Sequence, residues 1–558
     1  MDNRSEPSFE GPPPAGKARA ILWLLLILAV VTAIRIRLLD FPLQRDEGEF
    51  AYGGQLMLQG VCPYQAAYSM KWLGTDTAYA LIMAVFGQTA TGIHAGLILV
   101  SLATAGLVFL LTRRLCGNAA GVVAAGTYAL LSINPANLGL AAHATHFVML
   151  PALAGVVLLQ NLEDHTRSAR IFFAGLLLGL AVTMKQSGAA FGLFAAVWVA
   201  WCELSSGNRC WRRLFMRLGW LALGGMLPLV LMCGIVTLTG DFNRFWLWTV
   251  QYARAYTSIS TFGWGTVAWM LENVWDQCQA APGLWGLAVV GGLLLLCKQT
   301  LPRPRFFIIS FSLFSFLAVC PGWYFREHYF IQLLPAAGLL TAVAFDTISG
   351  VWARRKLPFS PATIPSAIFA IAAAWTLIQW RDIYFLLTPV QACRAVYASS
   401  PFPEAVEISR FLTSHCAPDV RILVMGSEPE IYFYSHRRSA TGYICTYPLM
   451  ERQPYAAAMQ REMIQEIERA NPAYVVFVNI HTSWQQSLTY TNRSIFDWFD
   501  QYRQEHLQLV GVTEILPGQP TEYRWLGPQD TVIEPRSAFW LAIFKNRSTV
   551  ENQPPKFR

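Results

Sequence analysis

The most informative stretch of this chain is ARAILWLLLILAVVTAIRIRLLDFPLQRDEGEF, residues 18–50. Most of its first half is apolar over the length that a helix needs to cross a hydrocarbon layer about 30 Å thick. Its last part carries three carboxylates in close succession, at Asp46, Glu47 and Glu49. Acidic groups that follow a span so closely lie at the membrane surface, where a lipid-linked substrate presents its head group. The stretch therefore predicts a membrane enzyme that acts on lipid-borne material.

The composition agrees with a membrane protein. Hydrophobic residues make up 54% of the chain, charged residues 14%, and the mean hydropathy is +0.36, values that are unusual for a soluble domain. We predict a polytopic helical protein with spans near residues 18–34, 93–111, 119–133, 143–159, 171–184, 188–201, 218–239, 283–296, 306–319, 329–345 and 362–377. Residues 76–87 are either a twelfth span or a helix that lies in the membrane interface, and the polar groups of Thr75, Asp76 and Tyr79 favour the interfacial helix.

The basic residues orient these spans. With the N-terminus inside, the inner segments carry about twice as many Lys and Arg as the outer loops, as the positive-inside rule requires. We therefore expect a multi-pass protein of the cytoplasmic (inner) membrane, with a disordered cytoplasmic tail at residues 1–17 and a retained first span. The net charge of +8 follows from this topology, so it does not indicate a nucleic-acid partner.

The chain changes character after Trp380, where the long apolar runs end. Helix-like patterns at 404–414, 456–470 and 495–503 alternate with strand-like runs at 421–425, 474–478, 507–515 and 539–544. This alternation predicts an extracytoplasmic α/β domain at residues 388–558 with a small, mostly parallel sheet. The turn at 426–429 follows a predicted strand, but without a Gly-rich repeat it is a poor nucleotide-binding signal.

The acidic cluster lies in the first outer loop, residues 40–92. If the cluster is helical, Asp46 and Glu49 share one face, so that one carboxylate can act as a base, or the pair can bind a divalent cation. The alternative is a helix N-terminus, where acidic side chains cap free N–H groups and favour the helix dipole.

Cationic candidates on the same side suit a phosphate; they are Lys71, Lys185, Arg254, Arg326 and His328. Lys185 lies between two short apolar segments, so it either faces a cavity or extends to the interface. The run 326–329 is either part of the site or an interfacial ion pair with an aromatic anchor. His143 and His146 are either metal ligands or interfacial polar residues.

The outer loop 241–281 is rich in Trp, Tyr and Phe, which either stack on sugar rings and prenyl tails or form an aromatic belt. Among the eleven cysteines, a disulfide within the set Cys393, Cys416 and Cys445 is one reading, and free thiols are the other.

The order of these features resembles the GT-C glycosyltransferases that use polyprenyl-phosphate sugars, related to protein O-mannosyltransferases and to the aminoarabinose transferases of lipid A. The resemblance rests on RDEGEFAYGGQLMLQGVCPY (45–64), YSMKWLG (68–74), FNRFWLWTVQYARAY (242–256) and GWYFREHYFIQLLPAAGLL (322–340). The chain departs from many relatives at Lys71-Trp72-Leu73, where they have Lys-Pro-Pro or Lys-Pro-Gly, and at His146, where they often carry Glu.

The resemblance implies a catalytic membrane domain at residues 18–387 and an inverting sugar transfer without a nucleotide site. It implies Asp46 as the catalytic base, Glu47 as the next acidic position of the motif, and Lys71 near the donor phosphate. The substrate-binding set that we expect is Glu49, Tyr52, Lys71, Lys185, Arg254, Tyr256, Arg326 and His328.

The expected partners are a polyprenyl-phosphate sugar, a lipid, glycan or protein acceptor, and the membrane. No cofactor is expected, although a divalent cation stays an open alternative. A transporter or flippase of lipid-linked or sugar substrates is the rival function, because it also needs charged residues inside a helix bundle. Such proteins are often built from repeated halves, and the chain shows no internal repeat.

Overall fold

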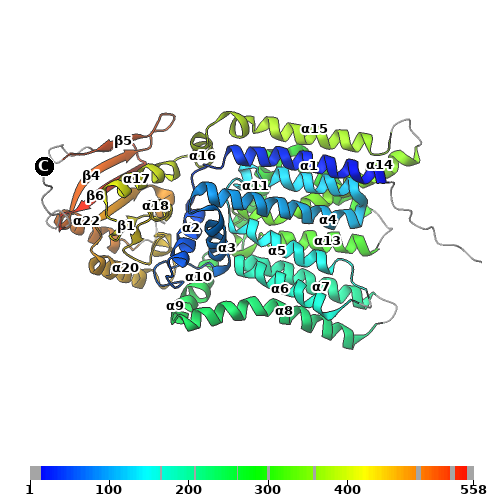
Figure 1. Ribbon diagram of the computed structural model, residues 1–558, viewed down its shortest axis with the longest axis horizontal. Helices are drawn as coiled ribbons and strands as arrows, with labels where there is room; N and C mark the ends of the chain where they lie inside the picture. Colours follow the sequence, from blue (N-terminus) through cyan, green and yellow to red (C-terminus); the bar gives the residue numbers. More distant parts are fainter. Residues whose placement is uncertain are drawn as a thin grey trace, which may run out of the picture.

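The computed structural model describes residues 14–163, 166–205, 209–260, 262–297, 302–355, 360–485, 492–527 and 534–548. It has two parts, a bundle of long helices and a C-terminal α/β domain that covers one end of the bundle (Figure 1). Between them lies a layer of short helices that includes α2 (Arg45–Leu58) and α3 (Leu73–Phe86).

The long helices coincide with the eleven predicted spans. They are α1 (Pro14–Arg37), α4 (Ala90–Leu131), α5 (Ala144–Leu159), α6 (Ser168–Met184), α7 (Ala189–Leu204), α8 (Trp211–Leu238), α12 (Pro282–Cys297), α13 (Pro302–Leu317), α14 (Leu334–Arg354) and α15 (Thr363–Gln379). By length and composition, five helices of the described residues suffice to cross a membrane, or six if α12 and the helix before it, α11 (Trp264–Ala280), form one span bent by 115°. Several of the remaining predicted spans are shorter apolar helices.

Helix α4 supplies two of the predicted spans because the chain reverses inside it. Gly117 has a φ of 85°, which side chains disfavour and glycine tolerates. A Cβ placed on Gly121 would lie 3.0 Å from the ring of Phe109, whereas a straight helix would separate these two residues by about 18 Å. The two halves of α4 therefore pack against each other as a helical hairpin, as the prediction of separate spans at 93–111 and 119–133 requires.

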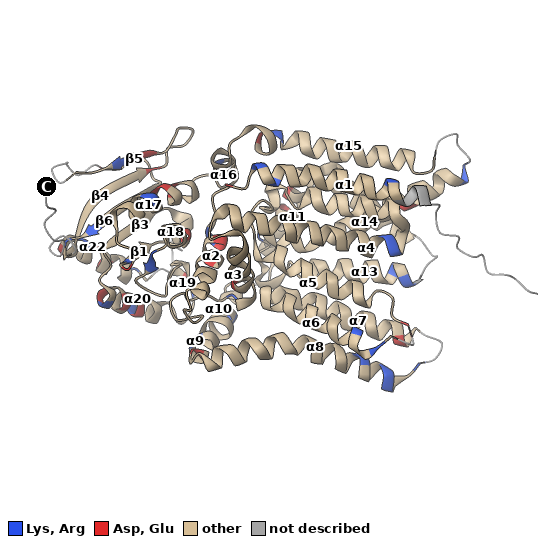
Figure 2. Ribbon diagram, viewed as in Figure 1, with Lys and Arg blue, Asp and Glu red and all other residues tan. Residues whose placement is uncertain are grey.

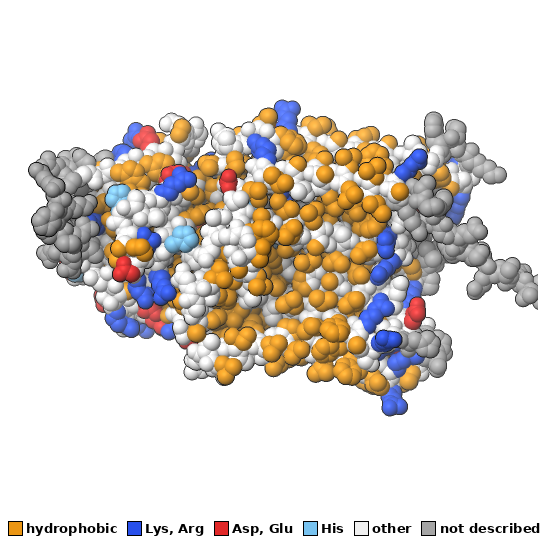
Figure 3. Space-filling view, viewed as in Figure 1, with side chains coloured by type: hydrophobic (Ala, Val, Ile, Leu, Met, Phe, Trp, Pro, Cys, Tyr) orange, Lys and Arg blue, Asp and Glu red, His pale blue; other side chains and the backbone are white. Residues whose placement is uncertain are grey.

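The outer surface of the bundle is apolar. On the face drawn in Figure 3, hydrophobic side chains cover the middle of the helical part, and charged side chains gather at its two ends. Lys and Arg are prominent at the end of the helices that points away from the α/β domain (Figure 2). Large apolar side chains are also exposed along α1, α8, α12 and α15. Apolar surface of this extent has no stable exposure to water, so the protein is a membrane protein.

Two arginines in the last turn of α1 are held by backbone carbonyls. The buried Arg35 donates from Nη2 to the carbonyl oxygens of Ser132 and Gly139, at 2.9 and 3.1 Å. Arg37 donates from Nη2 to the carbonyl oxygen of Leu387 at 2.5 Å. These contacts explain why basic residues occur at this end of the first span, against the general charge bias: they join it to neighbouring segments.

Short elements connect the long helices near the α/β domain. They are the 3₁₀ turns η1 (Pro135–Asn137), η2 (Gln186–Gly188), η4 (Pro321–Trp323) and η5 (Glu327–Leu333), the helices α9 (Phe242–Trp246), α10 (Ala253–Thr257) and α16 (Pro389–Tyr397), and the π-helical segments η3 (Leu247–Tyr252) and η6 (Asp382–Leu386). Helix α3 matches the interfacial helix predicted at 76–87, although it begins three residues earlier.

The α/β domain contains a mixed sheet. Its helices are α17 (Phe402–His415), α18 (Glu430–Ser435), α19 (Tyr447–Met450), α20 (Ala456–Ala470), α21 (His481–Trp484) and α22 (Ser494–His506). Its strands are β1 (Arg421–Met425), β2 (Arg438–Ser439), β3 (Tyr474–Asn479), β4 (Leu507–Glu514), β5 (Glu522–Trp525) and β6 (Trp540–Asn546). Within the described residues the strand order is β2-β1-β3-β6-β4-β5.

The prediction of a mostly parallel sheet is wrong for half of the sheet. Strand β1 pairs in parallel with β2 and β3, but β6 pairs antiparallel with both β3 and β4, and β5 pairs antiparallel with β4. Strand β4 follows β3 and α22 and runs parallel to β3, as a crossover connection dictates. The last strand, β6, then fills the position between them and must run the opposite way.

One hydrophobic core is shared by α2 and the α/β domain. Phe50 and Tyr52 of α2 are buried in the same cluster as Ile422 of β1 and Tyr432 of α18. The rings of Tyr52 and Tyr432 lie 5.3 Å apart, and the Tyr52 hydroxyl accepts a hydrogen bond of 2.9 Å from the backbone N–H of Ser439. The α/β domain is thus packed directly onto the helix that carries the acidic cluster.

The structure bears on the predicted N-terminal tail and on the disulfide considered for the cysteines. Most of the predicted disordered tail, residues 1–13, lies outside the described residues, whereas α1 already begins at Pro14. The eleven cysteines all lie within the described residues and none forms a disulfide there, so the bridge considered among Cys393, Cys416 and Cys445 is absent. These three thiols are buried, as small apolar side chains commonly are.

Candidate functional site

The first turn of α2 is fixed by a capping box. The side chain of Gln44 accepts a 2.9 Å hydrogen bond from the backbone N–H of Asp46, and a carboxylate oxygen of Glu47 accepts one of 3.2 Å from the backbone N–H of Gln44. Such reciprocal bonds satisfy N–H groups that the helix leaves free. The capping reading of the acidic cluster is therefore correct for Glu47, and the cap holds Asp46 at the start of the helix with its side chain free to make other contacts.

Lys71 joins the two remaining carboxylates of the cluster. Its ammonium group donates to Oδ1 of Asp46 at 2.8 Å and to Oε2 of Glu49 at 2.6 Å. The other oxygen of Glu49 accepts a 2.5 Å hydrogen bond from the hydroxyl of Ser69. Burial alone would raise the pKa of Asp46, but the charge of Lys71 holds it well below its usual range. Asp46 is accordingly an ionised carboxylate, as a base must be.

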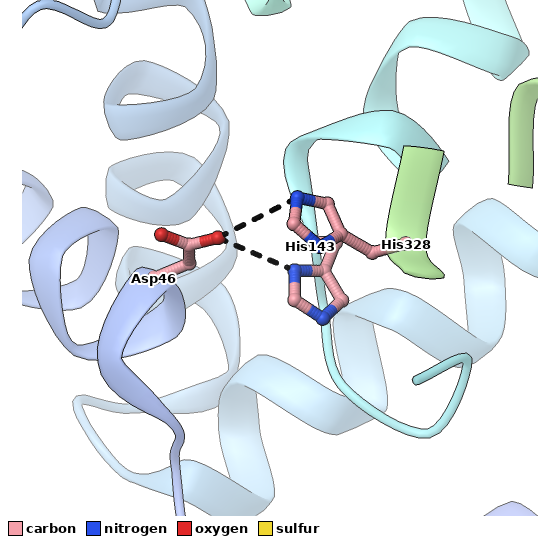
Figure 4. Close-up of side chains that lie close together, drawn as sticks. All are labelled: Asp46, His143 and His328. Carbon is pink, nitrogen blue, oxygen red and sulfur yellow. Dashed lines mark ion pairs between the residues drawn. The ribbon is translucent and has the colours of Figure 1, made fainter. Parts of the chain in front are cut away.

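Two histidines face the other oxygen of Asp46. Its Oδ2 lies 3.6 Å from Nδ1 of His143 and 3.7 Å from Nε2 of His328 (Figure 4). The two imidazole rings are stacked, with centroids 4.2 Å apart and an angle of 4° between their planes. His143 immediately precedes α5 and His328 lies in η5, so three separate segments of the chain meet at this carboxylate.

These residues open onto a cavity of about 530 Å³ between the helical bundle and the α/β domain. Its lining includes Asp46, Lys71, His143, Lys185, Tyr256, Arg326 and His328 from the bundle side, and Tyr447, Thr482 and Gln485 from the α/β domain. A cavity of this size can hold a small ligand. Arg45 and Glu327 also belong to the lining, so the chain has gathered two carboxylates and four cationic side chains around a space at the end of the long helices.

The cations of the cavity are packed against aromatic rings. The Lys185 ammonium lies 3.6 Å from the centre of the Tyr329 ring. Burial and the neighbouring charges of Lys71 and Arg326 lower the pKa of Lys185 to about 7. Arg326 lies 3.4 Å from the hydroxyl of Tyr256, and it is held over the Tyr324 ring at 5.6 Å. Lys185 lines the cavity, as the first of the two predictions for this residue requires.

Several predicted site residues do not line this cavity. Glu47 is fully buried, where it contacts Nε2 of His94 at 3.0 Å and accepts a 2.6 Å hydrogen bond from the backbone N–H of Ala142. Glu49 lies behind Lys71, in a smaller pocket with Asp76. The contacts of Tyr52 are with the α/β domain, and Arg254 is exposed on α10. Glu47, Glu49 and Tyr52 are thus placed to hold α2 rather than to touch a ligand of the cavity.

Other lining residues were not predicted. The sequence suggested His146 as the partner of His143. His146 is buried, and the histidine that meets Asp46 together with His143 is His328. Thr482 follows the end of β3, and the turn after β1 contacts α2, where Arg45 donates from Nε to the carbonyl oxygen of Ser427 at 2.6 Å. Ligand sites commonly lie beyond the carboxyl ends of parallel strands, and this rule was the available signal for both segments.

The comparison with protein families gives one match. Residues 74–233 match the family described as dolichyl-phosphate-mannose-protein mannosyltransferase. This range runs from α3 to α8 and so contains a large share of the helical bundle. No curated protein sequence matches the chain.

Solved structures with a similar fold are known. ArnT from Cupriavidus metallidurans, solved bound to undecaprenyl phosphate, matches with a TM-score of 0.59 and 15% identity, over 94% of this chain and 98% of ArnT. The archaeal oligosaccharyltransferase AglB from Archaeoglobus fulgidus, solved with an inhibitory peptide and a dolichol-phosphate, matches with a TM-score of 0.52 and 12% identity, over 93% of this chain and 76% of AglB.

A third match is the arabinofuranosyltransferase AftD from Mycobacteria, with a TM-score of 0.50 and 12% identity, over 96% of this chain and 40% of AftD. The protein therefore has the fold of the GT-C membrane glycosyltransferases, with an α/β domain at the C-terminal end. Within that class it is similar, over residues 74–233, to the dolichyl-phosphate-mannose-protein mannosyltransferases. The resemblance predicted from the sequence is confirmed.

Proposed function

We propose that the protein transfers a sugar from a polyprenyl-phosphate donor to a lipid, glycan or protein acceptor, with inversion at the sugar carbon and with Asp46 as the general base. The observation that carries this proposal is the cavity at the end of the spans, where Asp46 stands beside Lys71 and opposite Lys185 and Arg326. A base next to cationic groups is the arrangement that the reaction needs. The relatives support the donor class, since ArnT was solved with undecaprenyl phosphate and AglB with a dolichol-phosphate.

The chemistry assigns a task to each side of the cavity. An acceptor hydroxyl is a weak nucleophile at neutral pH, so a carboxylate within hydrogen-bond reach removes its proton while the new bond to the sugar forms. On the other side, the prenyl phosphate leaves with the electrons of the broken bond and gains negative charge. Lys71, Lys185 and Arg326 stabilise that charge.

The location of the cavity agrees with a lipid-borne donor. Charges such as Lys185 lie close to apolar helix ends, so a donor can keep its prenyl chain in the lipid while its phosphate and sugar enter the cavity. We place the cavity and the α/β domain on the outer face of the cytoplasmic membrane. The basic residues at the opposite end of the bundle (Figure 2) then lie inside, as the positive-inside rule requires.

The α/β domain supplies the part of the cavity opposite the bundle. Tyr447, Thr482 and Gln485 offer hydroxyl and amide groups there, which are the groups that recognise sugar hydroxyls or a polar acceptor. We infer that this domain contributes to the choice of the acceptor. Arg254 does not line the cavity, and its proposed contact with substrate therefore requires a ligand that extends beyond the cavity to α10.

The experiment that tests this function uses membranes that contain the full chain and, in parallel, membranes without it. A panel of radiolabelled polyprenyl-phosphate sugars is offered, and the label is followed into the lipid, glycan and protein fractions. We expect label to move from one donor class only when the chain is present, and nuclear magnetic resonance of the product to show an inverted linkage. Equal labelling with and without the chain, across a panel that covers hexose and pentose donors, would contradict the proposal.

A further inference from the structure

Three potential metal ligands converge at the cavity. They are Oδ2 of Asp46, Nδ1 of His143 and Nε2 of His328, and all lie within 4.8 Å of one another. Two imidazoles and one carboxylate form the ligand set of many catalytic Zn²⁺ sites, which keep a fourth position for water or substrate. Figure 4 shows both rings aimed at the same carboxylate from different segments of the chain.

The distances fit ligands of one ion better than hydrogen bonds. The separations of 3.6 and 3.7 Å between Oδ2 of Asp46 and the two nitrogens exceed the range of about 2.7 to 3.2 Å for an N–H···O hydrogen bond. Two ligands of a tetrahedral ion, each about 2.0 to 2.1 Å from the metal, stand roughly 3.4 Å apart. Small side-chain movements would bring the three atoms to that spacing.

The cap of α2 leaves Nδ1 of His143 without a short hydrogen bond. The amide oxygen of Gln44 is held by the backbone N–H of Asp46, so its amide nitrogen is the atom that lies 3.5 Å from Nδ1 of His143. This separation also exceeds the usual range of about 2.7 to 3.2 Å. Nδ1 therefore stays available as a ligand on the side that faces Asp46.

The stacking of the rings limits which positive charge can lie beside Asp46. With their centroids 4.2 Å apart and their planes nearly parallel, two protonated imidazoles would repel each other. One proton can serve only one of the two nitrogens. A single cation that lies between Oδ2 and the two ring nitrogens can serve all three ligands at once, while Lys71 stays bound to Oδ1.

We propose that Asp46, His143 and His328 bind one divalent transition-metal ion, with Zn²⁺ as the ion that this ligand set favours and with a free coordination position toward the cavity. The inference rests on the proposed function and deepens it. In its free position such an ion would hold a phosphate oxygen of the donor and add to the positive charge of Lys71, Lys185 and Arg326. The proton of the acceptor hydroxyl would still pass to Asp46.

The test measures metal binding by the purified full chain, without any transfer assay. The protein in detergent is stripped with a chelator and titrated with Co²⁺, whose visible absorption reports tetrahedral coordination, and then with Zn²⁺ as competitor. We expect one Co²⁺ per chain, displaced by Zn²⁺. The variants His143→Ala and His328→Ala should each lower the affinity by at least about 10-fold, since even outer contacts of a metal site are worth 10- to 100-fold.

A matched control is His506→Ala, which removes an exposed histidine on α22, far from the cavity in the sequence and outside its lining. It should bind Co²⁺ as the wild type does. Asp46→Asn provides a third ligand variant that keeps the size of the side chain, in case an alanine variant does not fold. Absence of a Co²⁺ spectrum in folded wild-type protein, or an unchanged spectrum in the folded ligand variants, would overturn the proposal.

The outcome separates the metal site from the proposed function. Transfer by a chain that binds no Co²⁺ or Zn²⁺ would overturn the metal site and leave the transfer reaction standing. Metal binding by a chain that transfers no sugar from any donor would support the site and contradict the function.

Discussion

Nζ of Lys71 lies 2.8 Å from Oδ1 of Asp46, although 25 positions separate the two residues in the chain. The contact joins the first turn of α2 to the loop that precedes α3. It also places a cation beside the proposed base, at the wall of the cavity that the donor phosphate would enter. One lysine thus both fixes the charge of the base and offers a contact to the leaving group.

Replacement of Lys71 by Met should reduce sugar transfer strongly. The change removes the cation that stabilises both Asp46 and the leaving phosphate, and the loss of one such group costs about 10²- to 10³-fold in kcat. Lys71→Arg keeps the charge, but its planar head differs in shape, so this control should retain more activity than the Met variant. Equal rates for Lys71→Met and the wild type would contradict a catalytic place for Lys71.

Lys185 should make donor binding depend on pH near neutrality. Its pKa is lowered to about 7, so its ammonium is charged below that pH and loses its charge as the pH rises above it. The KM for the donor should therefore rise between about pH 7 and 8. In Lys185→Arg the charge persists and this rise should move to a higher pH. A KM profile that is the same in both proteins would show that Lys185 does not bind the phosphate.

The ion pair between Arg45 and Glu428 should stabilise the contact between α2 and the α/β domain. The atoms Nη2 and Oε1 lie 3.3 Å apart, and Glu428 is completely buried. Glu428→Gln removes the partner of the Arg45 charge, and we expect it to lower the free energy of unfolding by about 1 to 3 kcal/mol. Thermal unfolding in detergent measures the change.

The control for this prediction is Glu407→Gln. Glu407 forms an exposed i,i+3 pair with Arg410 on α17, and exposed pairs contribute about 0 to 1 kcal/mol. If both variants unfold at the wild-type temperature, the Arg45 contact does not hold the α/β domain in place.

Gly48 should be required for the close approach of α2 to α18. A Cβ at this position would lie 2.5 Å from the backbone nitrogen of Glu430. Because backbone cannot move aside cheaply, Gly48→Ala should cost about 1 to 3 kcal/mol and displace the neighbouring Asp46, so that transfer falls as well. A Cβ on Gly265 in α11 would meet open space. The control Gly265→Ala should therefore leave the transfer rate at the wild-type value, and the free energy of unfolding unchanged or slightly raised.

The sequence predicted the helices and most of the strands because their patterns are local. Apolar runs located the long helices, and they separated residues 93–111 from 119–133, the two halves of α4 that reverse at Gly117. The position of β6 between β3 and β4 could not be predicted, because strand order depends on long-range packing and not on the pattern within each strand. For the same reason, the hydrogen bonds from the buried Arg35 to the carbonyl oxygens of residues 132 and 139 could not be predicted.

The candidate site was predicted only in part. Asp46, Lys71, Lys185, Tyr256, Arg326 and His328 all line the cavity, as a cluster at the ends of the spans should. Glu47 looked like Asp46 in the sequence, but the direction of a side chain at a helix start depends on its cap, and the cap turns Glu47 inward. The pairing of His143 with His328 joins residues 185 positions apart, and no local spacing could indicate it.

The central claim is that Asp46 takes the proton of the acceptor during sugar transfer. The most direct test compares initial transfer rates of purified wild type and Asp46→Asn with the donor found by the panel, using Asp500→Asn, an exposed position on α22, as the matched control. We predict a loss of about 10²- to 10⁴-fold in kcat for Asp46→Asn, with a folded protein and with wild-type activity in the control. A rate for folded Asp46→Asn that equals the wild-type rate would contradict the account.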